Sequence, residues 1–285
     1  MIAPRPTCVH SIEGWGGVPM HVPEYGNPDG PAIVLIHGWS QCHLSWAHQL
    51  TGSLADSYRL IAPDLRGHGN SGKPDAPENY NTSAPWAEDI RVILAELALE
   101  RPVLVGWSMG GWIVQDYLSV HGDTDISGFS LVGSSGATGR FTPLEALQRR
   151  VADDAVRADG MYSEDLAQNL TATLAFVQAC FATPQSPDDI AVMVGFNMLC
   201  PPSVRAAARK RHEDYRPMLR GITCPALVQW GIHERLLVSP MAEDTLDVLP
   251  NGKGIVYKNS GHAPFWEEPD LFDTDILNFA KAVLS

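Results

Sequence analysis

The sequence predicts an α/β protein, with a mostly parallel central sheet flanked by helices and an inserted helical cap. Short apolar runs bounded by glycine and proline alternate with longer helical patterns, and the alternation stops between about residues 137 and 218. Strands that alternate with helices build βαβ units and therefore a mostly parallel sheet. A chain of 285 residues buries enough surface to fold without disulfide or metal cross-links.

The expected strands begin with an alternating segment and continue as nearly unbroken apolar runs. Residues 18–25 alternate, which suits an antiparallel strand near the start. The later runs are mostly apolar throughout, as strands covered on both faces are. These runs are residues 32–36, 60–62, 103–105, 129–132, 226–230 and 255–257. Helices of the core are expected at residues 85–97, 111–119, 241–249 and 269–284.

Residues 137–216 are predicted to form the inserted cap, and residues 1–136 and 217–285 the core. Four helices are expected in the cap, at residues 143–157, 163–181, 188–198 and 203–215. This stretch contains more phenylalanine and methionine residues than a surface loop would need. We expect the cap to cover the carboxyl-terminal edge of the sheet, where open α/β sheets bind ligands.

The composition restricts the partners and the compartment. Thirty-three acidic against 20 basic residues give a net charge of −13, which repels phosphate backbones and anionic lipid headgroups, so neither nucleic acid nor a membrane is expected as a partner. No apolar run reaches the roughly 18 residues of a membrane span, and the first ten residues lack the apolar centre of a secretory signal. The five scattered cysteines suit a reducing compartment. We predict a cytoplasmic protein with a small-molecule substrate, and its oligomeric state stays open.

Residues 106–110 carry the clearest chemical motif, G-x-S-x-G, between a predicted strand and a predicted helix. This context is typical of a nucleophile elbow, in which a sharp turn exposes the serine hydroxyl. The flanking Gly106 and Gly110 are expected because side chains there would collide with the neighbouring strand and helix. Ser108 is the candidate nucleophile, and an inert serine in a glycine-rich turn is the alternative.

A serine hydroxyl needs a base, and a histidine base needs a carboxylate that orients it. His262 follows the last predicted strand by one short loop, which places it at the same sheet edge as Ser108. Glu234 follows the strand at residues 226–230, and the order Ser108, Glu234, His262 is the one that elbow enzymes use. The rival position for the acid, residues 133–136, contains no carboxylate. A surface histidine, and a solvated glutamate that pairs with its neighbouring arginine, are the alternatives.

The loop that ends the strand at residues 32–36 completes the predicted site. His37, Gly38 and Trp39 form a tight turn that faces the elbow. The backbone N–H groups of Trp39 and Met109 are predicted to form an oxyanion hole, because both point at the carbonyl oxygen under attack.

Two further patterns are not expected to bind anything. Residues 67–72 fit G-x-G-x-x-G, but two prolines follow where a dinucleotide-binding helix would have to begin. Cys42, His43 and His48 form a loose cluster, but the two histidines are five residues apart and do not share a helix face. We therefore predict neither a cofactor nor a metal site.

These motifs together resemble the α/β-hydrolase family over nearly the whole chain. The matching stretches are residues 37–39, 64–71, 106–111 and 260–265. Residues 213–219 and 222–228 look like the esterase and cofactor-free haloperoxidase (perhydrolase) branch. That family usually has aspartate where this chain has Glu234, and small residues where this chain has Trp112.

The motifs and the resemblance predict a serine hydrolase that cleaves a carboxylic ester or lactone through an acyl-enzyme. Other reactions on the same triad stay open, namely C–C bond hydrolysis, acyl transfer and perhydrolase or haloperoxidase activity. A non-enzymatic ligand receptor of the same fold is a further alternative.

Overall fold

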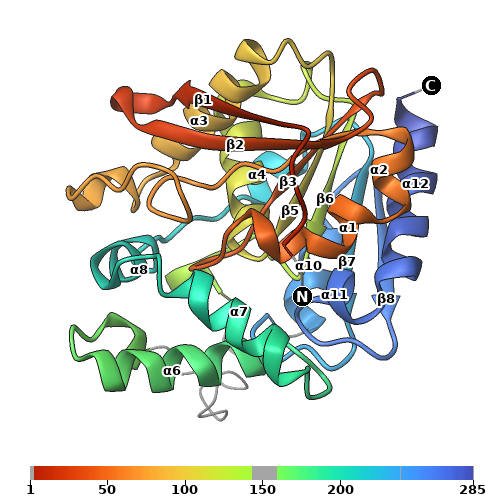
Figure 1. Cartoon of the computed structure of the whole chain (residues 1–285). Helices are drawn as coiled ribbons and strands as arrows, with labels where there is room; N and C mark the ends of the chain where they lie inside the picture. Colours follow the sequence, from red (N-terminus) through yellow and green to blue (C-terminus); the bar gives the residue numbers. More distant parts are fainter. Residues whose placement is uncertain (1–2, 143–158, 238, 285) are drawn as a thin grey trace.

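A mostly parallel sheet runs through the computed structural model, which describes residues 3–142, 159–237 and 239–284. Within these residues, one eight-stranded sheet has the order β1-β2-β4-β3-β5-β6-β7-β8 (Figure 1). β1 pairs with β2 and β2 with β4 in antiparallel fashion, and every other pairing is parallel. The strands are β1 (Cys8–Glu13), β2 (Pro19–Gly26), β3 (Ala32–Ile36), β4 (Arg59–Ile61), β5 (Val103–Trp107), β6 (Gly128–Val132), β7 (Ala226–Gly231) and β8 (Gly252–Tyr257).

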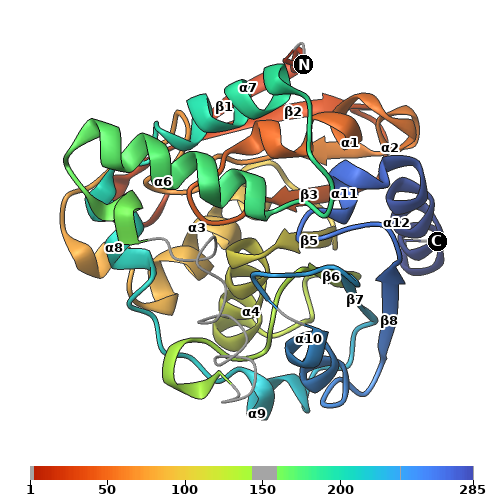
Figure 2. The same cartoon turned by 90° about the horizontal axis from the view of Figure 1, so that it is seen from below.

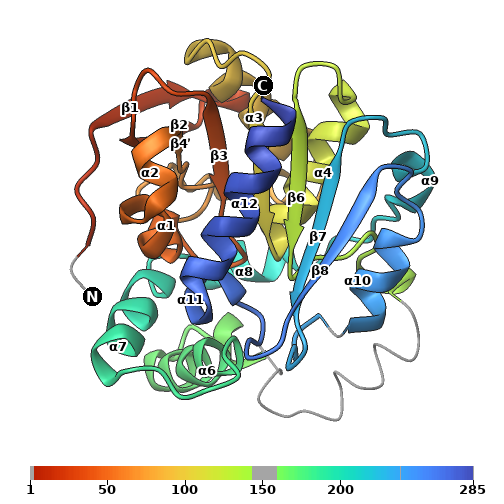
Figure 3. The same cartoon turned by 90° about the vertical axis from the view of Figure 1, so that its right-hand side faces the viewer.

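The central strands are buried along their whole length because helices cover both faces of the sheet. Every residue of β3, β5, β6 and β7 is buried, as the apolar runs predicted. One face is covered by α1 (Ala47–Thr51), α2 (Ser53–Ser57), α11 (Pro264–Glu267) and α12 (Pro269–Val283), and the other by α3 (Ser83–Glu96), α4 (Met109–His121) and α10 (Ser239–Leu246) (Figure 3). The predicted fold class is confirmed.

Three helices lie beyond the carboxyl-terminal edge of the sheet, and Figure 2 looks onto this edge with α6 and α7 in front of the strands. They are α6 (Leu166–Ala179), α7 (Pro187–Asn197) and α8 (Pro202–Ala208). The first two confirm predicted helices, while the helix predicted at residues 143–157 lies outside the described residues. Of the single helices in the described part, none is both long and apolar enough to cross a bilayer; α7 and α8 meet that test only as a pair bent by 84°.

The helix predicted at residues 203–215 is wrong in its extent, because α8 already ends at Ala208. Beyond it, the chain returns to the core: the backbone N–H of Thr138 donates to the carbonyl of Glu213 at 2.8 Å, and Ala137 and Asp214 form an antiparallel bridge. Backbone groups used in these contacts are not available to a helix. A four-residue helix, α9 (Arg216–Leu219), follows.

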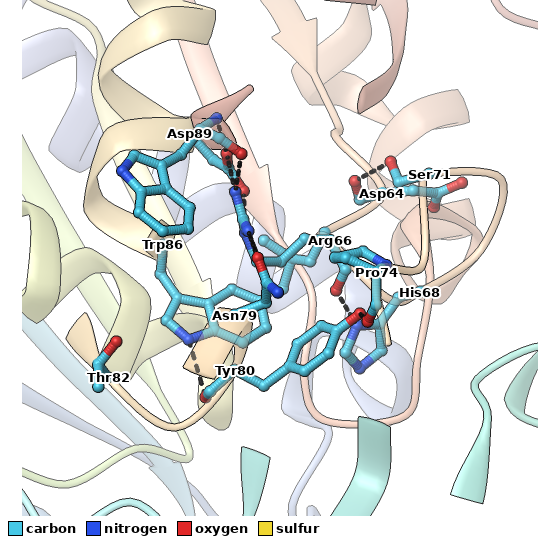
Figure 4. Close-up of polar contacts among 12 residues, drawn as sticks. Asp64, Arg66, His68, Ser71, Pro74, Asn79, Tyr80, Thr82, Trp86 and Asp89 are labelled. Atoms are coloured by element: carbon cyan, nitrogen blue, oxygen red, sulfur yellow. Dashed lines mark hydrogen bonds and ion pairs between the residues drawn. The ribbon is translucent and has the colours of Figure 1, made fainter. Parts of the chain in front are cut away.

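The loop after β4 is held against α3 by a buried ion pair (Figure 4). The Nε and Nη2 atoms of Arg66 donate to the two carboxylate oxygens of Asp89, each at 2.7 Å. Arg66 also donates to the side-chain oxygen of Asn79 and to the backbone carbonyl of Trp15. Burial raises the pKa of Asp89, and the Arg66 guanidinium opposes this rise. The pair therefore ties residues 64–71, one of the recognised motifs, to the core.

Arg66→Met is expected to lower the free energy of unfolding by about 3–5 kcal/mol, because the substitution leaves the Asp89 carboxylate buried without a counter-charge. Urea denaturation at neutral pH measures this change. Arg91→Met is the matched control, since the ion pair of Arg91 with Glu88 is solvent-exposed and is worth at most about 1 kcal/mol. Equal losses in the two variants would contradict a special role for the buried pair.

Candidate active site

The predicted elbow is a sharp turn between β5 and α4. Ser108 has a φ of 55°, a left-handed value that is rare outside glycine, and its backbone N–H donates to the carbonyl of Val132 at 2.8 Å. A Cβ atom at Gly106 would overlap the backbone of Gly110, and one at Gly110 would overlap the carbonyl of Ile36. The flanking glycines are therefore required, as predicted, and the turn leaves the Ser108 side chain partly exposed.

His262 and Glu234 meet in a buried pair at the same sheet edge. The Nδ1 atom of His262 lies 2.6 Å from Oε2 of Glu234, and both residues are buried. The other oxygen, Oε1, accepts the backbone N–H groups of Leu236 at 2.7 Å and Leu237 at 3.1 Å. Three donors thus fix the carboxylate, so Glu234 is not a solvated surface residue. An ionised carboxylate only accepts, so Nδ1 of His262 carries the proton and Nε2 is free to act as a base.

The serine and the histidine belong to loops that are linked through Trp107. The Trp107 indole N–H donates to the carbonyl of His262 at 2.8 Å, and the two rings lie 5.4 Å apart. Among the described residues, the Ser108 hydroxyl makes no hydrogen bond. Catalytic hydrogen bonds are often long without substrate and tighten only when it binds. The structure therefore pairs His262 with Glu234, whereas the Ser108 hydroxyl has no hydrogen-bond partner among the described residues.

Glu267 fastens the histidine loop to the end of α6, a contact that the sequence did not predict. Its Oε2 accepts the backbone N–H of Gly261 at 2.7 Å, and its Oε1 accepts those of Ala182 at 2.8 Å and Thr183 at 3.1 Å. Burial raises the pKa of Glu267, and these donors oppose the rise. We call these contacts of Glu267 with Gly261, Ala182 and Thr183 the Glu267 clamp. Next to it, the backbone N–H of His262 donates to the carbonyl of Cys180 at 2.9 Å.

The loop at residues 37–39 is held by the buried imidazole of His37. Its Nε2 accepts the backbone N–H of Leu65 at 3.0 Å, so its Nδ1 donates to the carbonyl of Gly38 at 2.8 Å. Burial lowers the pKa of His37 to about 4, which keeps this ring neutral at physiological pH. A Cβ atom at Gly38 would lie 3.2 Å from that of Ser108, so this loop passes directly beside the elbow.

The two predicted oxyanion donors belong to the residue that follows Ser108 and to the residue that follows Gly38, whose Cβ position would lie 3.2 Å from that of Ser108. Met109 is the first residue of α4, so its N–H has no acceptor within the helix. The N–H of Trp39 meets no acceptor among the described residues, and the Trp39 indole donates to the carbonyl of Arg205 at 3.1 Å. The arrangement provides two backbone donors next to a partly exposed serine.

His43 pairs with Asp64, and not with the cysteine and histidine considered in the sequence. Its Nδ1 and its backbone N–H lie 2.8 and 2.9 Å from one oxygen of Asp64. Burial alone would raise the pKa of Asp64, but the hydrogen bond and charge of His43 outweigh it and hold this pKa at about 2. His21 joins them, with one ligand atom of each residue within 4.8 Å of the others, which makes this a group of described residues that could hold a metal ion.

The other pattern set aside in the sequence lies in a loop. Residues 67–72 follow β4 without opening a helix, and the next helical turn is the short one at Pro77–Asn79. No helix N-terminus therefore points its N–H groups at a ligand from this loop, as a pyrophosphate site would need.

Comparison with known proteins places this geometry in a family. Residues 33–274 match the model of the alpha/beta hydrolase family. A solved esterase, RhEst1 from Rhodococcus sp. ECU1013, is 30% identical with a TM-score of 0.87, and the match covers 96% of this chain and 99% of that one. The pimeloyl-[acyl-carrier protein] methyl ester esterase of Vibrio vulnificus (strain YJ016) is 29% identical over 88% of this chain and 94% of the relative.

A bromoperoxidase from Bacillus anthracis shares the fold, with 22% identity and a TM-score of 0.81 over 96% of this chain and 99% of that one. The resemblance that the motifs indicated is thus confirmed across most of the chain. The protein is a hydrolase similar to esterases, and it belongs to the alpha/beta hydrolase family.

Proposed function

We propose that the protein is a serine hydrolase that cleaves a carboxylic ester or lactone through an acyl-enzyme. The observation that carries the proposal is the buried 2.6 Å pair of His262 and Glu234 at the edge where the strained elbow presents Ser108. Esterases among the similar proteins support the reaction type.

In this mechanism Ser108 attacks the carbonyl carbon while Nε2 of His262 takes the hydroxyl proton. Glu234 holds the imidazole in the required tautomer and stabilises the imidazolium that forms. The N–H groups of Trp39 and Met109 hold the oxyanion of the tetrahedral intermediate. His262 then gives its proton to the leaving alcohol, and a water molecule that it activates releases the acyl group.

A small apolar cavity next to the triad favours substrates with one short group. Trp107 and Ala263, the neighbours of Ser108 and His262, line it together with Phe181 and Phe265. Its volume is about 10 Å³, room for about one water molecule. We infer that an acetyl or methyl group fits here more readily than a long chain.

We also propose that residues 137–216 form a cap over the site. The substrate is proposed to be a small molecule, and the protein to act in the cytoplasm. The contacts of α6 with the His262 loop support a cap that closes over the catalytic residues.

A fluorophosphonate is expected to label Ser108 alone and to abolish the hydrolysis of p-nitrophenyl acetate, because only an activated serine attacks it. Peptide mass spectrometry locates the label. In a series of p-nitrophenyl esters, kcat/KM should fall steadily from the acetate to the decanoate. Labelling of another serine, with hydrolysis lost in parallel, would contradict the assignment.

A further inference from the structure

A second, larger cavity is lined in part by the helix that follows the elbow, and two of its lining residues pack near the proposed acid. Trp112 lines it from α4, one helical turn after Ser108, and Met241 lines it from α10. Trp112 packs with Met241 and Leu237, and the Leu237 N–H binds Glu234. The volume of this cavity is about 390 Å³, within the range of small-molecule sites.

The charged side chains that line this cavity are basic. Arg140 and Arg209 are exposed there, and no described lining residue is acidic. The Arg209 guanidinium lies over the Trp39 ring at 5.4 Å, and that of Arg140 over the Phe141 ring at 4.8 Å. Throughout the described ranges, neither guanidinium forms an ion pair. In a chain with a net charge of −13, two guanidinium groups with no ion-pair partner among the described residues form a positive site at this cavity.

The other polar groups of this wall do not cancel that charge. Arg211 also lines the cavity, but it is buried and neutralised by Asp116, whose Oδ2 lies 2.7 Å from its Nη2. His212 accepts the backbone N–H of Arg140 at 3.1 Å through its Nδ1, which leaves that nitrogen unprotonated. The net positive charge therefore rests on Arg140 and Arg209.

We propose that this cavity binds a negatively charged group, a carboxylate or a phosphate, carried by the substrate at some distance from the ester bond. The planar donor sets of Arg140 and Arg209 suit either anion. Trp112 and Met241 supply an apolar wall for the carbon chain that separates the anion from the ester. The inference rests on the proposed ester hydrolysis and adds to it a class of substrate, the anionic esters.

The kinetic test compares two acetate esters that differ in one terminal group of the alcohol, 4-acetoxybutanoate and butyl acetate. We expect kcat/KM of the wild type to favour the anionic ester at least tenfold, and Arg209→Gln and Arg140→Gln each to remove about tenfold of this preference, as loss of one charge-assisted hydrogen bond does. Lys210→Gln is the matched control, because Lys210 is exposed beside Arg209 without lining the cavity. It should leave the preference unchanged.

A binding test does not depend on turnover. Titration calorimetry of hexanedioate and of inorganic phosphate should show binding to the wild type and at least tenfold weaker binding to the Arg140→Gln/Arg209→Gln double variant. The tighter of the two ligands identifies the anion.

Neutral and anionic esters hydrolysed equally by all variants would overturn the inference while the proposed function stands. Absence of hydrolysis of any ester would overturn the proposed function, and calorimetry would still decide on the anion site. Equal binding by the double variant, or none by the wild type, would refute that site.

Discussion

Ser108→Ala is expected to lower kcat for p-nitrophenyl acetate by about 10⁴-fold or more, since loss of the nucleophile leaves only the catalysis supplied by the oxyanion hole and by binding. The fold should be retained, because alanine at the φ of 55° meets the same strain as serine and the side chain forms no hydrogen bond within the described structure. Steady-state kinetics measures the loss, and thermal unfolding verifies that the variant is folded.

Ser11→Ala serves as the control, since Ser11 is exposed on β1 at the far edge of the sheet. It should keep the wild-type rate. If Ser108→Ala retained most of the activity while folded, the elbow would not provide the nucleophile and the whole mechanism would have to be abandoned.

Glu234→Gln is expected to lower kcat by about 10⁴-fold, as the corresponding change of aspartate to asparagine does in serine proteases. An amide N–H facing Nδ1 of His262 would turn that nitrogen into an acceptor and place the proton on Nε2, where the base must be free. Glu234→Asp should keep partial activity, because the charge survives and only the reach of one methylene is lost. Comparing kcat of these two variants separates the effect of the carboxylate charge from that of the side-chain length.

Glu243→Gln on α10 is the matched control, because this glutamate is exposed, and it should change kcat little. A loss of less than about tenfold for Glu234→Gln, far below the serine-protease precedent, would mean that another group orients His262. The serine and histidine would keep their proposed roles in that case.

The strands of the core were predictable because burial on both faces leaves an almost unbroken apolar run. β1 was missed for the opposite reason: it is an edge strand whose residues are mostly exposed, with only Ile12 buried, so no pattern distinguishes it from a loop. The end of α8 was also missed: the helix stops at Ala208, and the chain beyond it pairs through Glu213 with Thr138, a residue far away in the sequence.

In the site, too, features set by local sequence were predictable, and contacts between distant segments were not. The elbow is a local structure, and its glycines and serine were predicted from their spacing and from the predicted strand and helix on either side. The partners of His43 and Glu267 depend on how distant segments dock. The sequence placed His43 near Cys42 and His48, whereas the fold puts it against Asp64, 21 residues away, and sets His48 against the Trp266 ring at 4.5 Å. No spacing rule connects such residues.

The clamp at Glu267 has a consequence for how this enzyme can diversify. One carboxylate holds both the His262 loop and the chain that leaves α6, so the junction would transmit any displacement of α6 to the proposed base. Substitutions on the outward faces of α6 and α7 avoid this junction. Selection can therefore reshape the outward faces of α6 and α7 for new substrates at little cost to the reaction, while residues 182–183, which Glu267 holds, have to stay as they are.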